Sequence, residues 1–230
     1  MAKQYHLISS LTCPWVQRSV IMLRVKQVDF DVTYINLREK PDWFLKISPH
    51  GKVPVLKVGD DVLFESNAIA EFLDETFEPR LHPADPIKRA QNRAWTDFIP
   101  DFAKGLTNIN YAKSPEEVAE AVEVATGRVK RVEEALRHRG NDGPYFNGDK
   151  ISLVDCGYGP FFQRFNLCDS FLKTGLLDKF PLVKAWSKTL LSSDAIVGAV
   201  APNFEEEYKA NLGRRGAYTA TLIPQAQAAE

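Results

Sequence analysis

The first part of the chain alternates between patterns typical of strands and of helices. Short runs rich in apolar and β-branched residues, Tyr5–Ser9 and Asp31–Asn36, predict two strands. Between them, apolar residues recur every three or four positions over Pro14–Gln27, which predicts a helix. A further apolar run is split by the turn-forming residues Gly59-Asp60-Asp61, and predicts a hairpin over 53–64.

Two more helices and a proline-rich segment follow from the same pattern. A short helix is expected around Asp42–Ile47, and a longer one begins at Ser66, which resembles an N-cap. The segment Glu78–Pro86 then holds three prolines in nine residues, which is typical of a linker.

Every periodic stretch after the linker is helical. The pattern predicts one long helix over 87–110 with a bend near Pro100, and an amphipathic helix over Ser114–Arg139. Ser152 and Asp155 form a variant of the capping box and should open another helix. We therefore expect a small α/β domain at 1–78, a linker at 79–86, an all-helical domain at 87–212, and a tail without clear periodicity at 213–230.

Composition narrows the functional classes. The chain has 230 residues, of which 44% are apolar and 26% charged, as in ordinary soluble globular proteins. A net charge of −1 provides no overall field that would attract nucleic acid or an anionic membrane. The N-terminal residues lack the apolar core of a signal peptide, so we expect a cytoplasmic protein. Three cysteines, an odd number, suit a reducing compartment better than a disulfide framework.

One of these cysteines, Cys13, lies where the first strand ends and the first helix begins. Pro14 suits the first helical position, and the helix N-terminus favours a thiolate. Arg18, one turn further on, should add positive charge. Position 16 is valine, so there is no C-x-x-C pair, and a resolving thiol must come from elsewhere, such as a small thiol cofactor.

The competing interpretation is that Cys13 is a small buried apolar residue, as most free cysteines are. Its position and Pro14 favour the reactive interpretation. Cys156 and Cys168 lie among apolar helical residues and are expected in the core. The four histidines are scattered, and no His/Cys pair has zinc-ligand spacing, so we predict no metal site.

Four motifs occur in order along the chain: CPWVQR at 13–18, NLREKPDWF at 36–44, GKVPVL at 51–56 and ESNAI at 65–69. With them the chain resembles the cytosolic glutathione transferase superfamily over nearly its whole length. It is most similar to the cysteine-type classes, nearest to omega, with lambda and dehydroascorbate reductases as cousins. The resemblance implies a thioredoxin-like, glutathione-binding N-terminal domain followed by an all-α C-terminal domain.

The resemblance also implies residue roles. Cys13 would be the catalytic residue, with its thiolate facing the sulfur of glutathione. Val53 would hydrogen-bond the cysteinyl part through its backbone, like an added strand, beside a cis Pro54. Glu65 would pair with the γ-glutamyl ammonium, and Ser66 lies where a helix N-terminus suits the γ-glutamyl carboxylate.

The remaining implied roles concern the glycyl end of glutathione, the lining of its site and the acceptor pocket. Lys40 would pair with the glycyl carboxylate, although a solvated surface lysine is the alternative. Leu37, Lys52 and Trp15 would line the glutathione site, and Trp15 would also wall an acceptor pocket between the domains. Four aromatic residues could line that pocket or belong to the core: Trp95, Phe98, Phe102 and Tyr111.

The function expected from this resemblance is glutathione-dependent thiol transfer or reduction through a mixed disulfide between Cys13 and glutathione. The partners would be glutathione and a small electrophilic or oxidised substrate, and the family implies a homodimer. One alternative is a glutathione lyase or reductive deglutathionylase acting on aromatic thioethers. Another, from a different class, is a non-catalytic interaction module with the glutathione transferase fold.

Overall fold

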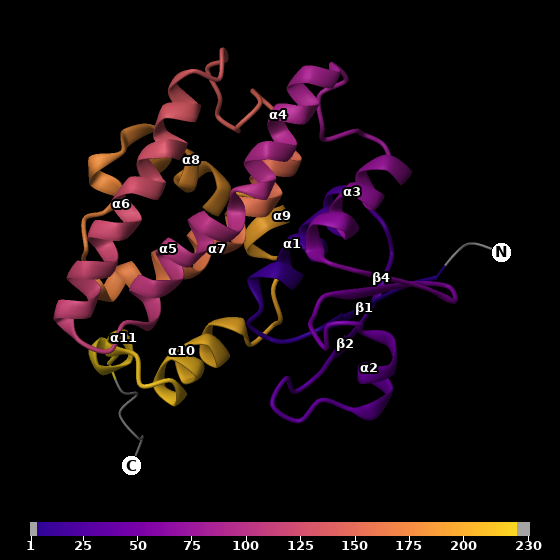
Figure 1. Cartoon of the computed structure of the whole chain (residues 1–230), viewed down its shortest axis with the longest axis horizontal. Helices are drawn as coiled ribbons and strands as arrows, with labels where there is room; N and C mark the ends of the chain where they lie inside the picture. The colour runs from indigo at the N-terminus through magenta and orange to yellow at the C-terminus, as the bar shows by residue number, and fades with distance from the viewer. Residues whose placement is uncertain (1–3, 225–230) are drawn as a thin grey trace.

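The N-terminal part is built on a small mixed sheet, seen at the right of Figure 1. The structure is a computed structural model and describes residues 4–224. The strands lie in the order β2-β1-β3-β4, with β1 parallel to β2 and antiparallel to β3. Their bounds are Tyr5–Ser9 for β1, Asp31–Tyr34 for β2, Val55–Val58 for β3 and Asp61–Phe64 for β4.

Three helices accompany the sheet: α1 at Pro14–Val25, α2 at Asp42–Ile47 and α3 at Ser66–Thr76. Helix α1 packs against α3 and, on its other side, against two helices of the C-terminal part. Its residues Ile21, Met22 and Leu23 are fully buried. Because α1 is shared by both parts of the molecule, its N-terminus lies near their junction.

The C-terminal part is entirely helical. The helices are α4 Pro86–Asp97, α5 Ile99–Tyr111, α6 Pro115–Arg137, α7 Leu153–Leu172, α8 Pro181–Leu191, α9 Asp194–Val197, α10 Phe204–Arg214 and α11 Tyr218–Leu222, with a 3-10 turn at Leu177–Lys179. Helix α7 lies at the centre and contacts α1, α4, α5, α8, α9 and α11. The predicted fold class, a thioredoxin-like domain followed by an all-α domain, is confirmed.

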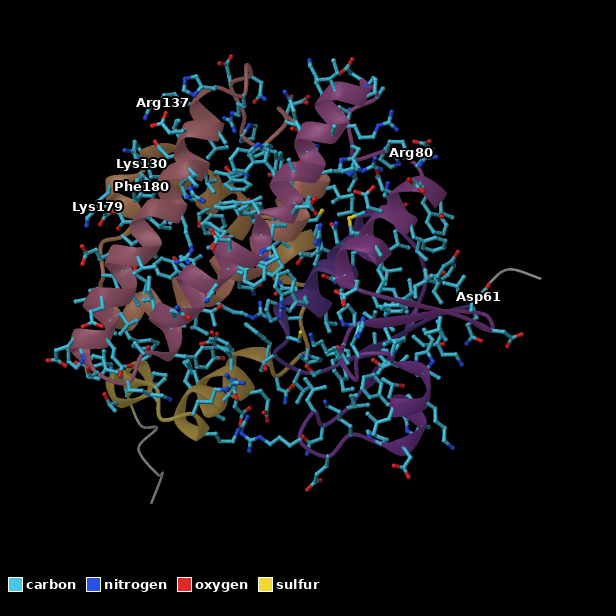
Figure 2. The ribbon with its side chains drawn as sticks, in the orientation of Figure 1. Asp61, Arg80, Lys130, Arg137, Lys179 and Phe180 are labelled. Atoms are coloured by element: carbon cyan, nitrogen blue, oxygen red, sulfur yellow. The ribbon has the colours of Figure 1, made fainter. Side chains whose placement is uncertain are left out.

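Charged side chains cover the outer faces of both parts. Lys130 and Arg137 project from α6 beside Lys179, while Arg80 and Asp61 lie on the opposite side of the molecule (Figure 2). No helix in the part of the chain that the structure describes combines the length and the apolarity needed to cross a bilayer.

Helix α7 owes its central place to small residues and to its cap. A Cβ atom on Gly157 would clash with Ile99, and one on Gly159 would lie 2.7 Å from Ile196 Cγ2, so both glycines permit close helix packing. The predicted capping box is confirmed. The buried Asp155 carboxylate accepts from the backbone N–H of Ser152 at 2.7 Å and from the indole N–H of Trp186 at 2.6 Å.

The helix predicted over 87–110 is divided into α4 and α5 at Phe98. Pro100 has no N–H group to continue the hydrogen bonds of α4, and its ring would clash with the carbonyl group four residues earlier in a continuous helix. The bend was therefore predicted at the correct place, but the structure turns it into a boundary between two helices. The strand predicted from Val53 begins at Val55, after the Val53–Pro54 peptide bond, which is cis as expected.

The predicted tail contains a helix that the sequence pattern did not indicate. Helix α11 has five residues, too few to display a period, and it is anchored by the buried Thr219, whose hydroxyl donates to the Asn110 carbonyl at 3.1 Å. Positions 225–230 of the predicted tail lie outside the described residues, as do positions 1–3.

Candidate functional site

Cys13 occupies the N-cap of α1, as predicted, with φ −74° and ψ 121°, and Pro14 is the first helical residue. The side chain is half-buried. The backbone N–H groups of Trp15 and Val16 lower the pKa of the thiol and so favour its ionised form. Such an arrangement can hold a thiolate at the start of a helix.

Burial nevertheless dominates the electrostatics of this thiol. It raises the pKa of Cys13 above the ordinary value, while the N–H of Val16, the charge of Arg164 and the N–H of Trp15 act in the opposite direction. The sequence led us to expect a favoured thiolate at Cys13, and burial of the sulfur corrects this expectation. The helix N-terminus acts as predicted, but removal of the sulfur from water outweighs it.

The cation near Cys13 is Arg164 of α7, which the sequence analysis missed. Its guanidinium is buried, donates twice to the Thr12 carbonyl at 3.0 and 3.2 Å, and donates to the Pro160 carbonyl at 2.8 Å. It also bonds the Gln17 side chain and lies 4.7 Å from the ring centre of Phe204. An arginine within an apolar helical run carries no local signal for such a role, because its partners near Cys13, Thr12 and Gln17, are about 150 positions away.

Arg18, which the sequence placed beside Cys13, has a different environment. It is buried, donates to the Asn67 side chain, and lines a separate cavity that α4 also borders. Burial lowers the pKa of Arg18 to about 10, although the charge of Asp97, among others, opposes this effect. The positive charge near Cys13 that the sequence assigned to Arg18 is therefore supplied by Arg164.

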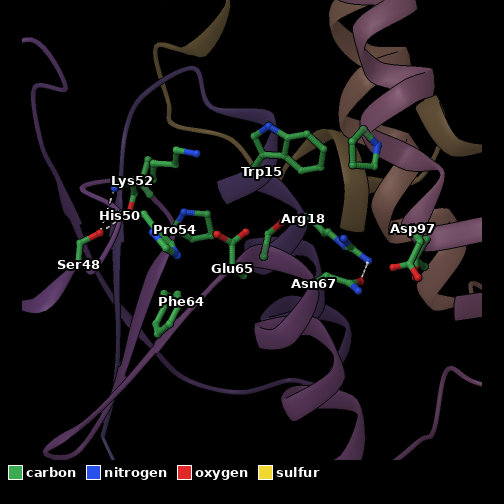
Figure 3. Close-up of a pocket in the computed structure, with 14 residues that line it drawn as sticks. Trp15, Arg18, Ser48, His50, Lys52, Pro54, Phe64, Glu65, Asn67 and Asp97 are labelled. Carbon is green, nitrogen blue, oxygen red and sulfur yellow. Dashed lines mark hydrogen bonds between the residues drawn. The ribbon is translucent and has the colours of Figure 1, made fainter.

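The cavity that Arg18 lines collects most of the residues expected to bind glutathione. It measures about 280 Å³, near the small end of the range for small-molecule sites. Six of the predicted residues border it: Trp15, Lys52, Val53, Pro54, Glu65 and Ser66. We call it the first cavity. Figure 3 shows Lys52 and His50 on one side, Glu65 in the middle, and Arg18 with Asp97 on the other side.

The N-terminus of α3 opens onto the first cavity. Ser66 is the first helical residue and Glu65 is the N-cap, so the expectation that Ser66 caps the helix is corrected by one position. Glu65 has φ +65°, an unusual conformation for a residue with a side chain. Free backbone N–H groups at this helix start, together with the Glu65 carboxylate, provide both signs of charge for a zwitterionic group.

Cys13 lines a second cavity, of about 230 Å³, rather than the first. This second cavity lies between α1, β2 and the segment 198–201, and Arg164 borders it as well. Leu37 lines a further cavity beside the same loop. Lys40 is exposed, makes no ion pair within residues 4–224, and its Nζ lies near Gly51.

The structure does not bring the four candidate acceptor residues together. Trp95 borders a cavity with Lys88 and Phe146, and Phe98 packs edge-on against Trp95. Phe102 is fully buried against Tyr158 and Phe162, as the core interpretation expects. Tyr111 accepts from Asn211 at 2.9 Å and lies under Arg215, near the cavity of Leu37.

The other two cysteines occupy the core, as predicted. Cys156 and Cys168 are fully buried, and burial raises the pKa of both thiols, to about 12 for Cys168. Within residues 4–224, no group of three or more histidine, cysteine or carboxylate side chains is placed to hold a metal ion.

Comparison with known proteins connects this geometry to a family. Models of the glutathione S-transferase N-terminal and C-terminal domains match residues 12–76 and 116–189. Rat glutathione S-transferase omega-1 is 29% identical over 81% of this chain and 76% of its own. Glutathione S-transferase U16 of Arabidopsis thaliana is 33% identical over 84% of this chain and 86% of its own.

A solved structure supports the same relationship. The Tau class glutathione S-transferase MiGSTU from mango, Mangifera indica, superposes with a TM-score of 0.80 at 26% identity, covering 93% of this chain and 99% of that one. The matched domains, the two relatives and this structural similarity show that the chain belongs to the glutathione S-transferase family.

Proposed function

We propose that this protein is a cysteine-type glutathione transferase, nearest to the omega class, that carries out glutathione-dependent thiol transfer and reduction. The observation that carries the proposal is the position of Cys13, a free thiol at the N-cap of α1, two residues before Trp15, which borders the first cavity. The similarity to an omega-1 relative supports the class.

Glutathione would bind in the first cavity in an extended form. Its γ-glutamyl ammonium would pair with Glu65, and its γ-glutamyl carboxylate would face Ser66 and the N-terminus of α3. The backbone of Val53, at the cis peptide bond, would hydrogen-bond the cysteinyl part. Lys52, on the wall of the first cavity, and Lys40, whose Nζ lies near Gly51, would serve the glycyl end.

The reaction would be thiol–disulfide exchange on a glutathione mixed disulfide, RS–SG. The Cys13 thiolate attacks the glutathionyl sulfur, the RS–SG bond breaks, and its electron pair leaves on RS⁻, which takes a proton from water. A second glutathione thiolate then attacks the Cys13–glutathione disulfide, which releases Cys13 and oxidised glutathione. The buried Arg164 and the N–H groups of Trp15 and Val16 support the negative charge on Cys13 in both steps.

Two other functions compete with this one. A lyase or reductive deglutathionylase would use the same Cys13 to remove glutathione from an aromatic thioether. A non-catalytic module would not need a charged binding cavity, yet Glu65, Ser66, Lys52 and Val53 all border the first cavity. This retention of binding groups favours an enzyme.

We further propose that the protein acts as a homodimer in the cytoplasm. The three cysteines are unpaired in the structure, which suits a reducing compartment. Sedimentation and cell fractionation test these two points separately.

The proposed chemistry is tested by intact-protein mass spectrometry after incubation with oxidised glutathione. We expect the native protein to gain one glutathionyl group, which reduced glutathione then removes. The Cys13→Ser variant should gain none, whereas the matched control Cys156→Ala should behave like the native protein, because Cys156 is fully buried. An adduct that persists in Cys13→Ser, or no adduct at all, would overturn the proposal.

A further inference from the structure

A large cleft lies beside the Cys13 loop and has no role in the chemistry above. It measures about 580 Å³ and is formed where the two parts of the molecule meet. One wall is the loop Ser10–Thr12 with residues 34–38, and the other is the outer face of α10. We call it the arginine cleft, after Arg38, Arg214 and Arg215, which border it.

The arginine cleft is positively charged although the chain as a whole is not. Three arginines and one acidic residue, Glu207, border it, in a chain whose net charge is −1. Glu207 pairs with Arg214 at 3.4 Å. Arg38 and Arg215 have no carboxylate within 4.0 Å among residues 4–224. The cleft therefore holds two cationic groups without anionic partners in the described structure.

The two cations come from different parts of the molecule. Arg38 follows β2 in the N-terminal part, and Arg215 follows α10 in the C-terminal part. Arg215 lies 4.9 Å over the ring of Tyr111, and the neighbouring Asn211 bonds the Tyr111 hydroxyl. These contacts hold the C-terminal wall of the cleft in place. The electric field of charged groups is also stronger inside a cleft than on an open surface.

The arginine cleft lies beside the cavity that Cys13 lines. Ser10, Leu11 and Tyr34 border both. The Cys13 side is mainly apolar, with Phe30 and Val32 among its walls. A small molecule could therefore place an apolar stem towards the sulfur of Cys13 and an anionic group among the arginines. Glutathione itself would occupy the first cavity, whose lining residues are all different.

We propose that the preferred acceptors carry an anionic group, typically a carboxylate, and that Arg38 and Arg215 bind it in the arginine cleft. This inference rests on the proposed function, because it concerns the half of the mixed disulfide that leaves as RS⁻. In RS–SG the glutathionyl half lies in the first cavity and the anionic RS half points into the arginine cleft. The exchange step is unchanged, and the arginines stabilise the bound RS half without entering the chemistry.

The test uses three glutathione mixed disulfides that differ in one terminal group: 3-mercaptopropionate (anionic), 2-mercaptoethanol (neutral) and cysteamine (cationic). The release of oxidised glutathione, coupled to glutathione reductase, gives kcat/KM for each at low ionic strength. We expect kcat/KM to fall from the anionic to the neutral to the cationic substrate, by about five- to tenfold between the first two, as contacts to two partly exposed cations would give. Added salt should reduce this ratio.

Variants then test whether the preference for the anionic substrate depends on the arginine cleft. Arg38→Gln combined with Arg215→Gln should bring the anionic-to-neutral ratio close to one. The control Arg131→Gln removes another exposed arginine, on α6 and outside the cleft, and should leave the ratio unchanged. Equal kcat/KM values for the three substrates, or a ratio that the double variant retains, would overturn the acceptor assignment alone. Absence of turnover together with absence of the Cys13 adduct would instead overturn the proposed function.

Discussion

At the scale of single residues, the positive charge of Arg164 opposes the effect of burial on the pKa of Cys13. Arg164 is 4% exposed, and burial lowers the pKa of its guanidinium to about 10. Within residues 4–224 no carboxylate lies within 4.0 Å of it, and carbonyl oxygens of Thr12 and Pro160 are among its hydrogen-bond partners. A buried cation without an anionic partner is costly. A thiolate on Cys13 would supply negative charge at the same place.

We therefore predict that Arg164→Gln shifts the ionisation of Cys13 to higher pH. An opposite charge within several ångströms changes a pKa by about one unit or more, so the midpoint of the rate–pH profile for Cys13 alkylation should rise by about one unit. At a fixed neutral pH, alkylation should accordingly be slower. Mass spectrometry of the iodoacetamide adduct at Cys13 gives the rate.

Arg164→Lys serves as the control for this prediction. Lysine keeps the charge but cannot bond Thr12 in two places, so its midpoint should remain near the native one. Circular dichroism would establish that both variants are folded. A native midpoint in a folded Arg164→Gln protein would contradict the role of the charge.

Among the elements, α7 depends on the absence of side chains at the points where it approaches its neighbours. Gly157 faces Ile99 at the start of α5, and a Cβ at position 157 would overlap the Ile99 side chain. Gly157→Ala should therefore reduce the free energy of unfolding by about 1–3 kcal/mol, despite the better helix propensity of alanine.

The matched control is Gly127 in the middle of α6, where an added Cβ meets nothing within 4 Å. Gly127→Ala should stabilise the protein by about 0.5–1 kcal/mol. Urea denaturation followed by fluorescence measures both changes. Equal effects of the two substitutions would show that helix propensity, and not packing, determines the stability of α7.

Elements with a clear local signal could be predicted from the sequence. Pro14 at the first position of a helix and the Ser152–Asp155 capping box set helix starts that the structure reproduces. The boundary at Phe98 and the short helix α11 depend on tertiary packing. The local pattern therefore predicted only a bend at the boundary, and it predicted no helix at the position of α11.

The candidate site was predictable to the extent that its residues belong to short sequence motifs. Trp15, Val53, Pro54, Glu65 and the residues near them belong to motifs, and the structure collects them in one cavity. The partner of Cys13 comes from α7, and the arginine cleft joins residues that are far apart in the sequence. No local sequence pattern indicates that such distant residues lie close together in the fold. The net pKa shift of Cys13 also depends on burial, which the sequence does not specify at a helix start.

At the scale of the whole molecule, the connection between the two parts is fixed by a buried ion pair. Lys26, at the end of α1, donates to the Asp74 carboxylate of α3 at 2.7 Å, and both side chains are almost fully buried. Lys26 also donates to the Phe77 and Pro79 carbonyls. Asp74 in turn accepts from the backbone N–H of Leu81 at 2.7 Å. The linker is thereby held against the N-terminal part.

This arrangement predicts that loss of one charge is far more damaging than loss of both. Asp74→Ala leaves the ammonium of Lys26 buried without its carboxylate partner, and should reduce the free energy of unfolding by about 3–5 kcal/mol. Replacing both residues by apolar ones, Lys26→Met with Asp74→Leu, should restore most of this loss. Some loss should remain, because the backbone N–H of Leu81 stays unpaired.

Chemical denaturation of the single and double variants measures both effects, with the exposed pair Lys184–Asp178 as a control. Asp178→Ala should change the free energy of unfolding by less than about 1 kcal/mol, since both partners of that pair are more than half exposed. If Asp74→Ala costs no more than Asp178→Ala, the linker is held by apolar packing alone. A large cost in Asp74→Ala with recovery in the double variant would assign that role to the buried pair, because only an uncompensated charge behaves in this way.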